Sequence, residues 1–430
     1  MDLYNEILEN KGTYIKDYKK MKNEVKNSKA IYKGKPVPFL YLPKIYTKNE
    51  INEFKRIKEK IFDLVNTIID LYLNKKEVRK MYDFDKRLDE LIRIDHGYNT
   101  YVPMGRFDLF YYGKDNFKFC ELNTDGSSAM LEDKELGSIL HKSKIMKKYK
   151  EKQKITNFEL FNSWVDEVDE IKDEFFETKK ESYNLAIVDI FEKEPTYEFE
   201  EFKKHFNSRN YNCFIADARD IKYEDGFIFY DDKKIDIVYR RLVTKDLMEN
   251  YDEINSFIKG IKAKNTCIIG SIKSQIVHTK LFFKVLHDKR FKEYLDPNQK
   301  EFIKKAIPKT YSLENVKEEY IKNKNSYIIK PIDSYASKGV FSGKDFTKVK
   351  WLDLLNEKVN EKYLIQEYCN PCLEKNVLIN SKNIKIKKFN KIVGLYVYNE
   401  NLNGIYTRVG LNPIISGLHD CYTLPSFKKV

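Results

Sequence analysis

Residues 104–130, MGRFDLFYYGKDNFKFCELNTDGSSAM, form the stretch that decides the fold. Two runs of apolar and aromatic residues, 109–112 and 117–120, lie on either side of the turn-like tetrad 113–116. Two such runs joined by a short polar turn are typical of a β-hairpin. The sequence therefore predicts two adjacent antiparallel strands at this point of the chain.

Polar side chains stand at the same end of both predicted strands. Arg106 and Asp108 are two residues apart, and so are Glu121 and Asn123. Because residues i and i+2 of a strand point to the same face, the two pairs are expected to converge. Asp108, Glu121 and Asn123 would then form an all-oxygen cluster of the kind that Mg²⁺ prefers. The alternative is a hairpin whose charged residues are only solvated or paired.

Composition sets the class of protein. The chain has 430 residues, of which 42% are hydrophobic and 14% aromatic, so it can bury a substantial core and is not disordered. Its formal net charge of +13 raises nucleic-acid binding as an alternative function. However, acidic residues are interspersed almost everywhere, which indicates a compositional bias rather than a basic patch.

The sequence also bears on location. It contains no run of about 18 uncharged apolar residues, and its N-terminus lacks a basic start followed by an apolar stretch. The six cysteines are mostly scattered, as thiols in a reducing compartment would be. We therefore expect a cytoplasmic protein with no membrane segment.

Three regions are predicted along the chain. Residues 1–180 form a helical region that carries the hairpin, and within it Thr47 and Glu50 form a capping-box pattern before a helix over 51–71. Residues 181–262 form a small parallel α/β subdomain on the probable substrate side. Residues 263–430 hold the remaining strands.

The middle region alternates strands with a helix. Strands are predicted over 185–189 and 213–217, with a helix between them, and a further strand pair over 227–230 and 235–239. The second strand of that pair ends on Arg240 and Arg241, which could hold a substrate carboxylate bidentately. The alternative role for the two arginines is a structural ion pair.

A second group of candidate residues lies in the last region. Lys330 sits in the apolar strand 327–331 and needs an anionic partner, for which a nucleotide phosphate would serve. The small-residue segment 333–343 could lay backbone N–H groups over a phosphate chain, although its spacing is not that of a P-loop. The apolar strand 363–368 could present its backbone to an adenine edge. A later hairpin ends near Arg408.

The order of these motifs resembles the synthetase domain of the glutathionylspermidine synthase family. The resemblance covers about residues 35–425 and is carried by an ordered set of positions: Arg106, Asp108, Glu121, Asn123, Lys280, Ile329, Lys330, Pro331, Ile365, Gln366, Glu367, Tyr368, Thr407, Arg408 and Gly410. It implies an ATP-grasp-like α/β (α+β) fold of a circularly rearranged type. The small Rossmann-like parallel-sheet subdomain would be inserted between the metal-binding hairpin and the lysine-bearing strands.

The resemblance further implies an ATP-dependent carboxylate–amine ligase that uses ATP and Mg²⁺. Its acid would be a small molecule or a peptide, and its amine could be a polyamine. The implied site residues are Asp108, Glu121 and Asn123 for magnesium, Arg106 and Arg408 for catalysis, Lys280 and Lys330 for the phosphates, Ser337, Lys338 and Gly339 for the lid, and Gln366, Glu367 and Tyr368 for adenine and ribose.

Two other interpretations stay open at this stage. One is a kinase on the same scaffold, which would transfer phosphate to a small hydroxyl substrate. The other concerns a zinc site, for which Cys369, Cys372, His419 and Cys421 supply four possible ligands. The second half of that set, His-x-Cys, has poor spacing for zinc.

Overall fold

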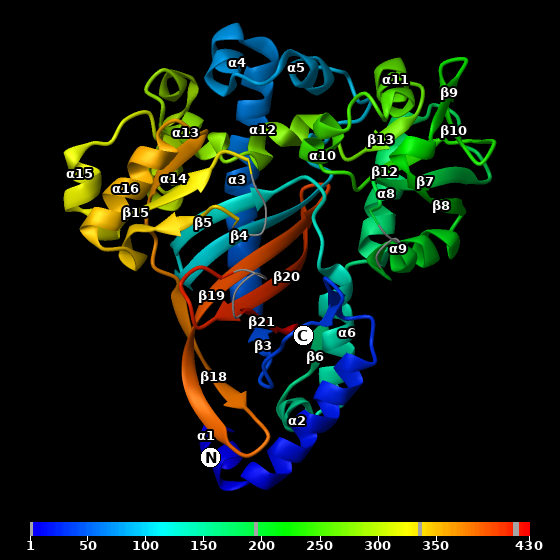
Figure 1. Ribbon diagram of the computed structural model, residues 1–430. Coiled ribbons are helices and arrows are strands. Elements are labelled where there is room, and N and C mark those ends of the chain that lie inside the picture. The colour runs from blue at the N-terminus through cyan, green and yellow to red at the C-terminus, as the bar shows by residue number, and fades with distance from the viewer. Residues whose placement is uncertain (1–2, 193–196, 334–337, 416–420) are drawn as a thin grey trace.

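The computed structural model describes residues 3–192, 197–333, 338–415 and 421–430. A central antiparallel sheet is flanked by a parallel sheet on one side and a smaller antiparallel sheet on the other, with N-terminal helices and a long hairpin below (Figure 1). This mixed α/β architecture confirms the predicted fold class in its coarse form.

The predicted hairpin is present and lies within the central sheet. Strands β4 (Met104–Gly113) and β5 (Asn116–Asn123) pair so that Arg106 faces Asn123 and Asp108 faces Glu121. The remaining strands come from the last quarter of the chain. They are β18 (Cys372–Ile379), β19 (Ile384–Tyr398), β20 (Asn401–Gly410) and β21 (Cys421–Leu424), in the order β21-β20-β19-β4-β5 with β18 also paired to β19.

One long helix covers a face of this sheet. Helix α3 (Lys48–Asn74) begins at the predicted capping box, where Thr47 accepts from the backbone N–H of Glu50 and the Glu50 carboxylate accepts from that of Thr47. Its apolar residues recur at helical spacing and are buried against the sheet. The Phe62 and Phe107 rings, for example, lie 5.2 Å apart. Burial of this stripe fixes the hairpin to the helix.

The parallel sheet is built from four strands. Their order is β13 (Cys267–Ile269), β12 (Ile237–Arg240), β7 (Tyr183–Asp189) and β8 (Tyr211–Asp217), and all neighbours run parallel. The helices in this part of the chain are α8 (Asn162–Phe175), α9 (Tyr197–Asn207), α10 (Thr244–Glu249) and α11 (Asn255–Ala263), of which α8 and α9 contact the parallel sheet. Strand β13 belongs to the segment that the sequence assigned to the last region. The Rossmann-like description of this unit stays a prediction.

The predicted pairing of 227–230 with 235–239 is wrong. Strand β10 (Phe227–Tyr230) pairs instead with β9 (Lys222–Glu224) and β11 (Lys233–Lys234), whereas β12 joins the parallel sheet. The physical reason is burial, since all four residues of β12 are buried and a central parallel strand buries both of its faces.

The second antiparallel sheet carries Lys330. Its order is β14 (Thr310–Ser312), β17 (Tyr363–Glu367), β15 (Tyr327–Pro331) and β16 (Phe341–Ser342). The helices that precede or cover it are α12 (Gln275–His278), α13 (Leu281–His287), α14 (Pro297–Ala306), α15 (Glu318–Lys322) and α16 (Lys348–Lys358). A core of its own packs around the buried Trp351.

The N-terminal part of the chain lies beside the C-terminal strand. The N-terminal helices and those that follow are α1 (Leu3–Glu9), α2 (Lys11–Lys26), α4 (Lys76–Tyr82), α5 (Lys86–Ile92), α6 (Met130–Leu140) and α7 (Lys144–Lys152). Below the central sheet, β22 (Ser426–Lys429) lies between β3 (Lys44–Tyr46) and β6 (Ile155–Asn157), and β1 (Ile31–Tyr32) pairs with β2 (Lys35–Pro36).

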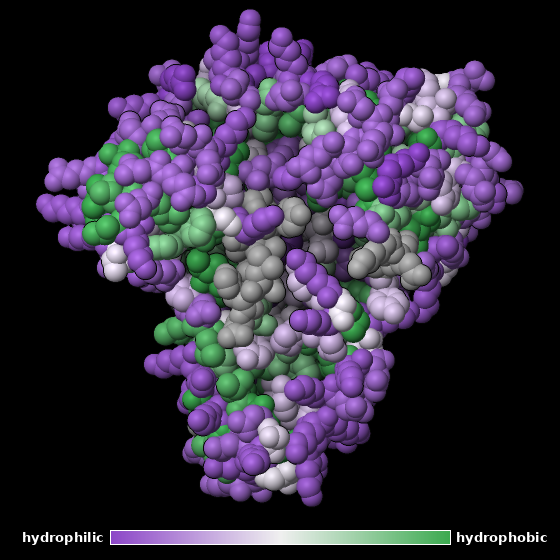
Figure 2. Space-filling model, in the orientation of Figure 1, coloured by the Kyte–Doolittle hydropathy of each residue, from purple (hydrophilic) through white to green (hydrophobic). Residues whose placement is uncertain are grey.

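The outer surface is largely polar. Figure 2 shows hydrophilic side chains over most of the face in view, with hydrophobic ones in smaller groups between them. None of the helices in the described ranges combines the length and the apolar character that crossing a membrane requires.

Candidate active site

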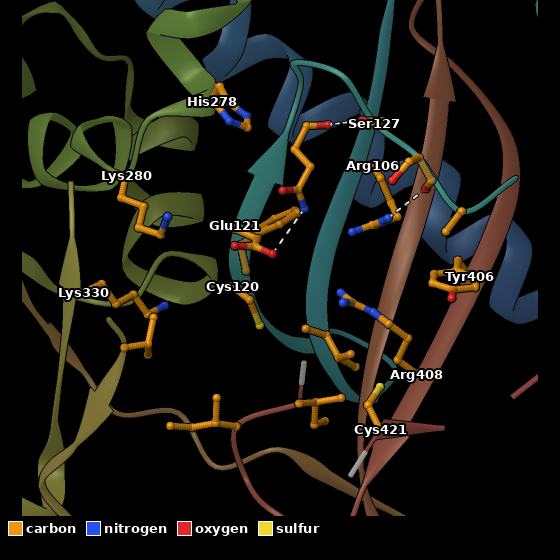
Figure 3. A pocket seen from close by; sticks show the side chains of 18 of the residues that line it. Arg106, Cys120, Glu121, Ser127, His278, Lys280, Lys330, Tyr406, Arg408 and Cys421 are labelled. Carbon is orange, nitrogen blue, oxygen red and sulfur yellow. Dashed lines mark hydrogen bonds between the residues drawn. The ribbon is translucent and has the colours of Figure 1, made fainter. Parts of the chain in front are cut away.

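A cavity of about 600 Å³ lies where the central sheet, the second antiparallel sheet and the loop after β5 meet. Nine of the residues that the family resemblance assigns to the site line it: Arg106, Glu121, Asn123, Lys280, Lys330, Gln366, Glu367, Tyr368 and Arg408. Figure 3 shows Lys280 and Lys330 at one end and Arg106 and Arg408 at the other, with Glu121 between them. Side chains that are far apart in the sequence thus face one space.

Asp108 lies behind this cavity as the shared counter-ion of two arginines. Its carboxylate is fully buried, and it accepts from Arg106 Nε at 3.0 Å and from Arg408 Nη2 at 2.5 Å. Asn123 Nδ2 donates to the same carboxylate at 3.2 Å. Burial by itself would lower the pKa of both guanidinium groups, but the charge of Asp108 keeps the pKa of Arg106 and of Arg408 above its usual value. Both arginines therefore stay charged and are held in place.

Gly394 on β19 makes room for this arrangement. It lies opposite Asp108 in the sheet. A Cβ atom at this position would lie 2.6 Å from Asp108 Oδ1 and 2.8 Å from Arg106 Cδ. Only a residue without a side chain lets the ion pair lie flat against the strand.

Glu121 is the ionised carboxylate at the centre of the cavity. Burial by itself would raise its pKa, but Lys280, Arg408 and Lys330 together outweigh burial and lower the pKa of Glu121 to about 2. Asn123 Nδ2 also donates to Glu121 Oε1 at 3.3 Å. The position thus offers a permanently charged oxygen ligand beside an amide.

These groups fit a magnesium ion. Mg²⁺ is usually held by one or two carboxylates and completes its shell with water and substrate phosphates. Glu121 provides such a carboxylate on the cavity wall, and the side-chain amide of Asn123 is next to it. Both oxygens of Asp108 accept hydrogen bonds from the two arginines, and Asp108 does not line the cavity. Its predicted role as a direct magnesium ligand therefore stays a prediction. Nowhere in the described ranges do three or more His, Cys, Asp or Glu side chains form a metal-binding group.

The two lysines are held differently. Lys330 Nζ donates to Gln366 Oε1 at 2.8 Å, and Gln366 Nε2 donates in turn to Thr310 Oγ1 at 2.8 Å. Gln366 is buried, so its side chain positions Lys330 more than it exposes a surface to a ligand. Lys280 is buried as well, which lowers its pKa, and the nearby charge of Glu121 opposes that effect. Both ammonium groups point toward Glu121 (Figure 3).

Only part of the predicted lid falls within the described residues. Ser337 lies outside them, Lys338 is exposed, and Gly339 has the positive φ of +75° that favours glycine. Two residues of the segment 333–343, Asp333 and Val340, line the cavity. The role of 333–343 as a lid stays a prediction.

The structure places Arg240 and Arg241 in ion pairs, and neither arginine lines the cavity, although Asp125, the partner of Arg240, does. Arg240 Nη2 donates to Asp125 Oδ1 at 2.7 Å, and Arg241 Nη2 donates to Glu198 Oε1 at 3.0 Å. All four side chains are buried. This geometry matches the structural alternative, in which each guanidinium group is used to neutralise an acid inside the protein.

The four residues considered for zinc do not come together as a described site. Cys369 and Cys421 line the cavity and Cys372 lies on β18, whereas His419 is outside the described residues. All six cysteines are free thiols.

The comparison with protein families supplies the decisive observation. The model of the glutathionylspermidine synthase preATP-grasp family matches residues 31–416. The chain belongs to this family. The resemblance drawn from the ordered motifs is thereby confirmed.

Solved structures support the overall fold. A glutathione synthetase-like effector from Globodera pallida in its apo form superposes with a TM-score of 0.60 at 14% identity, over 96% of each chain. A macrocyclase from Microcystis aeruginosa with its precursor peptide (TM-score 0.31, 14% identity, 56% of this chain and 90% of that one) is too distant for a structural argument. The same holds for D-alanyl-alanine synthetase A from Vibrio cholerae (0.31, 9%, 58% and 89%). No curated protein matches the sequence.

Two residues of the site were missed from the sequence. Gly394 has a signal that could have been used, because a glycine inside an apolar strand often marks the close approach of another group. Glu132, which lines the cavity from the first turn of α6, has no such local signal. Its position becomes meaningful only once α6 is placed beside β20.

Replacing Gly394 by alanine tests the packing of the ion pair. The added methyl group would displace Asp108 and Arg106, so we expect Gly394→Ala to lower the free energy of unfolding by about 1–3 kcal/mol. Urea denaturation measures this effect. Gly12→Ala is the control, because nothing lies within 4 Å of its added methyl group and helix α2 should tolerate it. Unchanged stability in Gly394→Ala would refute the packing argument.

Replacing Arg240 tests its structural role. Arg240→Ala leaves Asp125 buried without its cation, and we expect a loss of about 3–5 kcal/mol in the free energy of unfolding. Arg219→Ala removes a solvent-exposed ion pair with Asp217 and should change the stability much less than Arg240→Ala does. If Arg240→Ala kept its stability and lost only affinity for an acid substrate, the carboxylate-binding alternative would hold instead.

Proposed function

We propose that this protein is an ATP-dependent ligase that joins a carboxylate to an amine through an acyl-phosphate and releases ADP and phosphate. One observation carries the proposal: two lysines, two arginines and an ionised glutamate line one cavity in a chain of the glutathionylspermidine synthase preATP-grasp family. These are the charges that phosphoryl transfer requires, since this reaction depends on positioning and on neutralising the phosphate oxygens.

Each group has a role in this scheme. Lys280 and Lys330 neutralise the α- and β-phosphates at one end of the cavity. Glu121 and Asn123 hold magnesium, and Asp108 fixes the two arginines behind them. When bound, Mg²⁺ neutralises and orients the phosphate oxygens of ATP. Glu367 and Tyr368, which line the cavity beside Lys330, border adenine and ribose.

The arginines act on the acid. A carboxylate resists attack by an amine because its carbonyl is electron-rich and its leaving group is poor. Arg106 and Arg408 can hold the acid beside the γ-phosphate and then stabilise the negative charge on the acyl-phosphate and on the tetrahedral species. Segment 333–343, including Lys338 and Gly339, would shield the acyl-phosphate from water until the amine arrives.

The name of the family suggests which substrates to test first. A thiol tripeptide such as glutathione as the acid and a polyamine such as spermidine as the amine are therefore the first pair to test. The free cysteines agree with a reducing compartment, and a cytoplasmic location is part of the same proposal.

The function is tested by incubating the protein with ATP, Mg²⁺ and the small-molecule fraction of a cell extract. We expect mass spectrometry to show a new compound whose mass equals an acid plus an amine minus water, formed together with ADP. A stable phosphorylated compound would indicate a kinase instead. Neither product, with no magnesium-dependent ATP binding, would overturn the assignment.

Glu121→Gln tests the metal assignment. We expect ADP formation to fall by on the order of 10²-fold or more, because the neutral amide cannot replace a charged metal ligand. Since the pKa of Glu121 is lowered to about 2, its carboxylate is charged in the wild type from about pH 5 to about pH 8, and its contribution to magnesium binding should be constant there.

The control is Glu314→Gln, which alters an exposed glutamate outside the cavity and should keep full activity. Urea denaturation shows whether the Glu121 variant is still folded. Normal turnover in Glu121→Gln would exclude this residue as a ligand.

A further inference from the structure

Glu132 is a carboxylate in the cavity that has no role in the proposed phosphoryl transfer. It lies in the first turn of α6 and lines the cavity together with Arg106, Tyr406 and Arg408. Tyr406 Oη donates to Glu132 Oε2 at 3.1 Å and also shares a hydrogen bond of 3.0 Å with Thr423 Oγ1. Both guanidinium groups lie over the Tyr406 ring, at 5.7 Å for Arg106 and 5.9 Å for Arg408. Glu132 is thus at the arginine end of the cavity.

Two acids near this end of the cavity, Glu198 and Asp108, have cationic partners, whereas Glu132 has none among the described residues. Glu198 is paired with Arg241 at 3.0 Å, and its other oxygen accepts from the backbone N–H of Leu131 at 3.1 Å. Asp108 is paired with two arginines. Within the described ranges no lysine or arginine forms an ion pair with Glu132. Glu132 therefore faces the cavity and could pair with a positively charged group of a ligand.

The groups that act on Glu132 set its ionisation. They come from several elements packed around it and are Tyr32, Arg106, Asp133, Glu198, Tyr406, Arg408 and Cys421. Burial and the charge of Glu198 outweigh the hydrogen bond from Tyr406 and the two arginines, and they raise the pKa of Glu132 to about 7. At neutral pH such a group can both accept and release a proton.

We propose that Glu132 binds the ammonium group of the amine substrate and removes the proton that blocks its attack. The inference rests on the proposed ligase function. An alkyl amine is protonated at neutral pH and has no free electron pair until it loses a proton. Glu132 lies at the arginine end, where the acyl-phosphate carbonyl would be held.

The step is balanced in protons and electrons. The ammonium nitrogen gives one proton to Glu132 and becomes a neutral amine. Its electron pair then forms the bond to the carbonyl carbon, and the carbonyl π electrons move onto the oxygen to give the tetrahedral species. The carbonyl re-forms as the bond from that carbon to the phosphate oxygen breaks. The second proton leaves the nitrogen with the departing phosphate, and Glu132 returns its own proton to solvent.

Other groups in the cavity are less suited to this task. Glu121, with a pKa of about 2, is too weak a base. His278 lines the cavity as well, but it lies with Lys280 at the opposite end (Figure 3).

The experiment compares two kinds of amine in the Glu132→Gln variant. The wild type and the variant receive ATP, Mg²⁺ and the small-molecule fraction of a cell extract as the source of acids, with either the amines of the extract or added hydroxylamine. Hydroxylamine is largely unprotonated at neutral pH and needs no base. We expect the variant to lose amide formation with the extract amines by about 10²-fold or more. Its hydroxamate formation should stay within about twofold of the wild type.

Two further readouts separate chemistry from structure. In the wild type, the rate with extract amines should fall as the pH drops through about 7, because protonated Glu132 cannot accept a proton, and this limb should be absent in Glu132→Gln. Glu132→Asp should restore part of the rate. Glu135→Gln, one turn further along α6 and outside the cavity lining, is the matched control and should behave as the wild type.

The outcomes are distinct. If the wild type forms neither amide nor hydroxamate, the ligase function fails and the inference with it. If Glu132→Gln loses both products equally while the wild type forms both, or keeps full activity with the extract amines, the ligase stands and the role of Glu132 is refuted.

Discussion

The site depends on one buried carboxylate between two cations. Without Asp108, the guanidinium groups of Arg106 on β4 and Arg408 on β20 would repel each other across β19, the strand between them, and both side chains are largely buried. With it, β4 and β20 present two fixed positive charges on the same side of the cavity. The absence of a side chain at Gly394 is part of the same arrangement, because the carboxylate lies where a Cβ atom would be. The role of Asp108 in the hairpin thus depends on β19 and β20, which come much later in the chain.

The charges of the cavity are divided between its two ends. The ends are separated by Glu121, whose pKa is lowered because positive groups act on it from both directions. Glu132 lies in the arginine half. Its pKa is shifted in the opposite direction from that of Glu121, because burial and a neighbouring acid raise it. Two carboxyl groups of the same type are therefore given different protonation by their surroundings, which is a common basis for dividing tasks within an active site.

The sequence was most informative where local pattern decides structure. The hairpin around 113–116, the capping box at Thr47 and the ordered motifs that led to the family could all be read from spacing and residue type. Pairings over long distances could not. The partners of Arg240 and Arg241, the place of β12 in a parallel sheet and the location of Glu132 depend on contacts between segments whose separation in the sequence carries no signal. The contact between Gln366 and Lys330 was likewise not foreseen, whereas the nucleotide-binding role that the family resemblance assigns to Gln366 stays a prediction.

The position of β19 has a consequence for how the protein is made. This strand pairs with β4, β18 and β20, and it is synthesised long after β4. While the ribosome is still translating the middle of the chain, the early hairpin has one unpaired edge rich in aromatic residues, which is a template for association with other chains. Until β19 emerges, that edge can pair with another chain, because α3 covers a face of the hairpin and leaves its edge open.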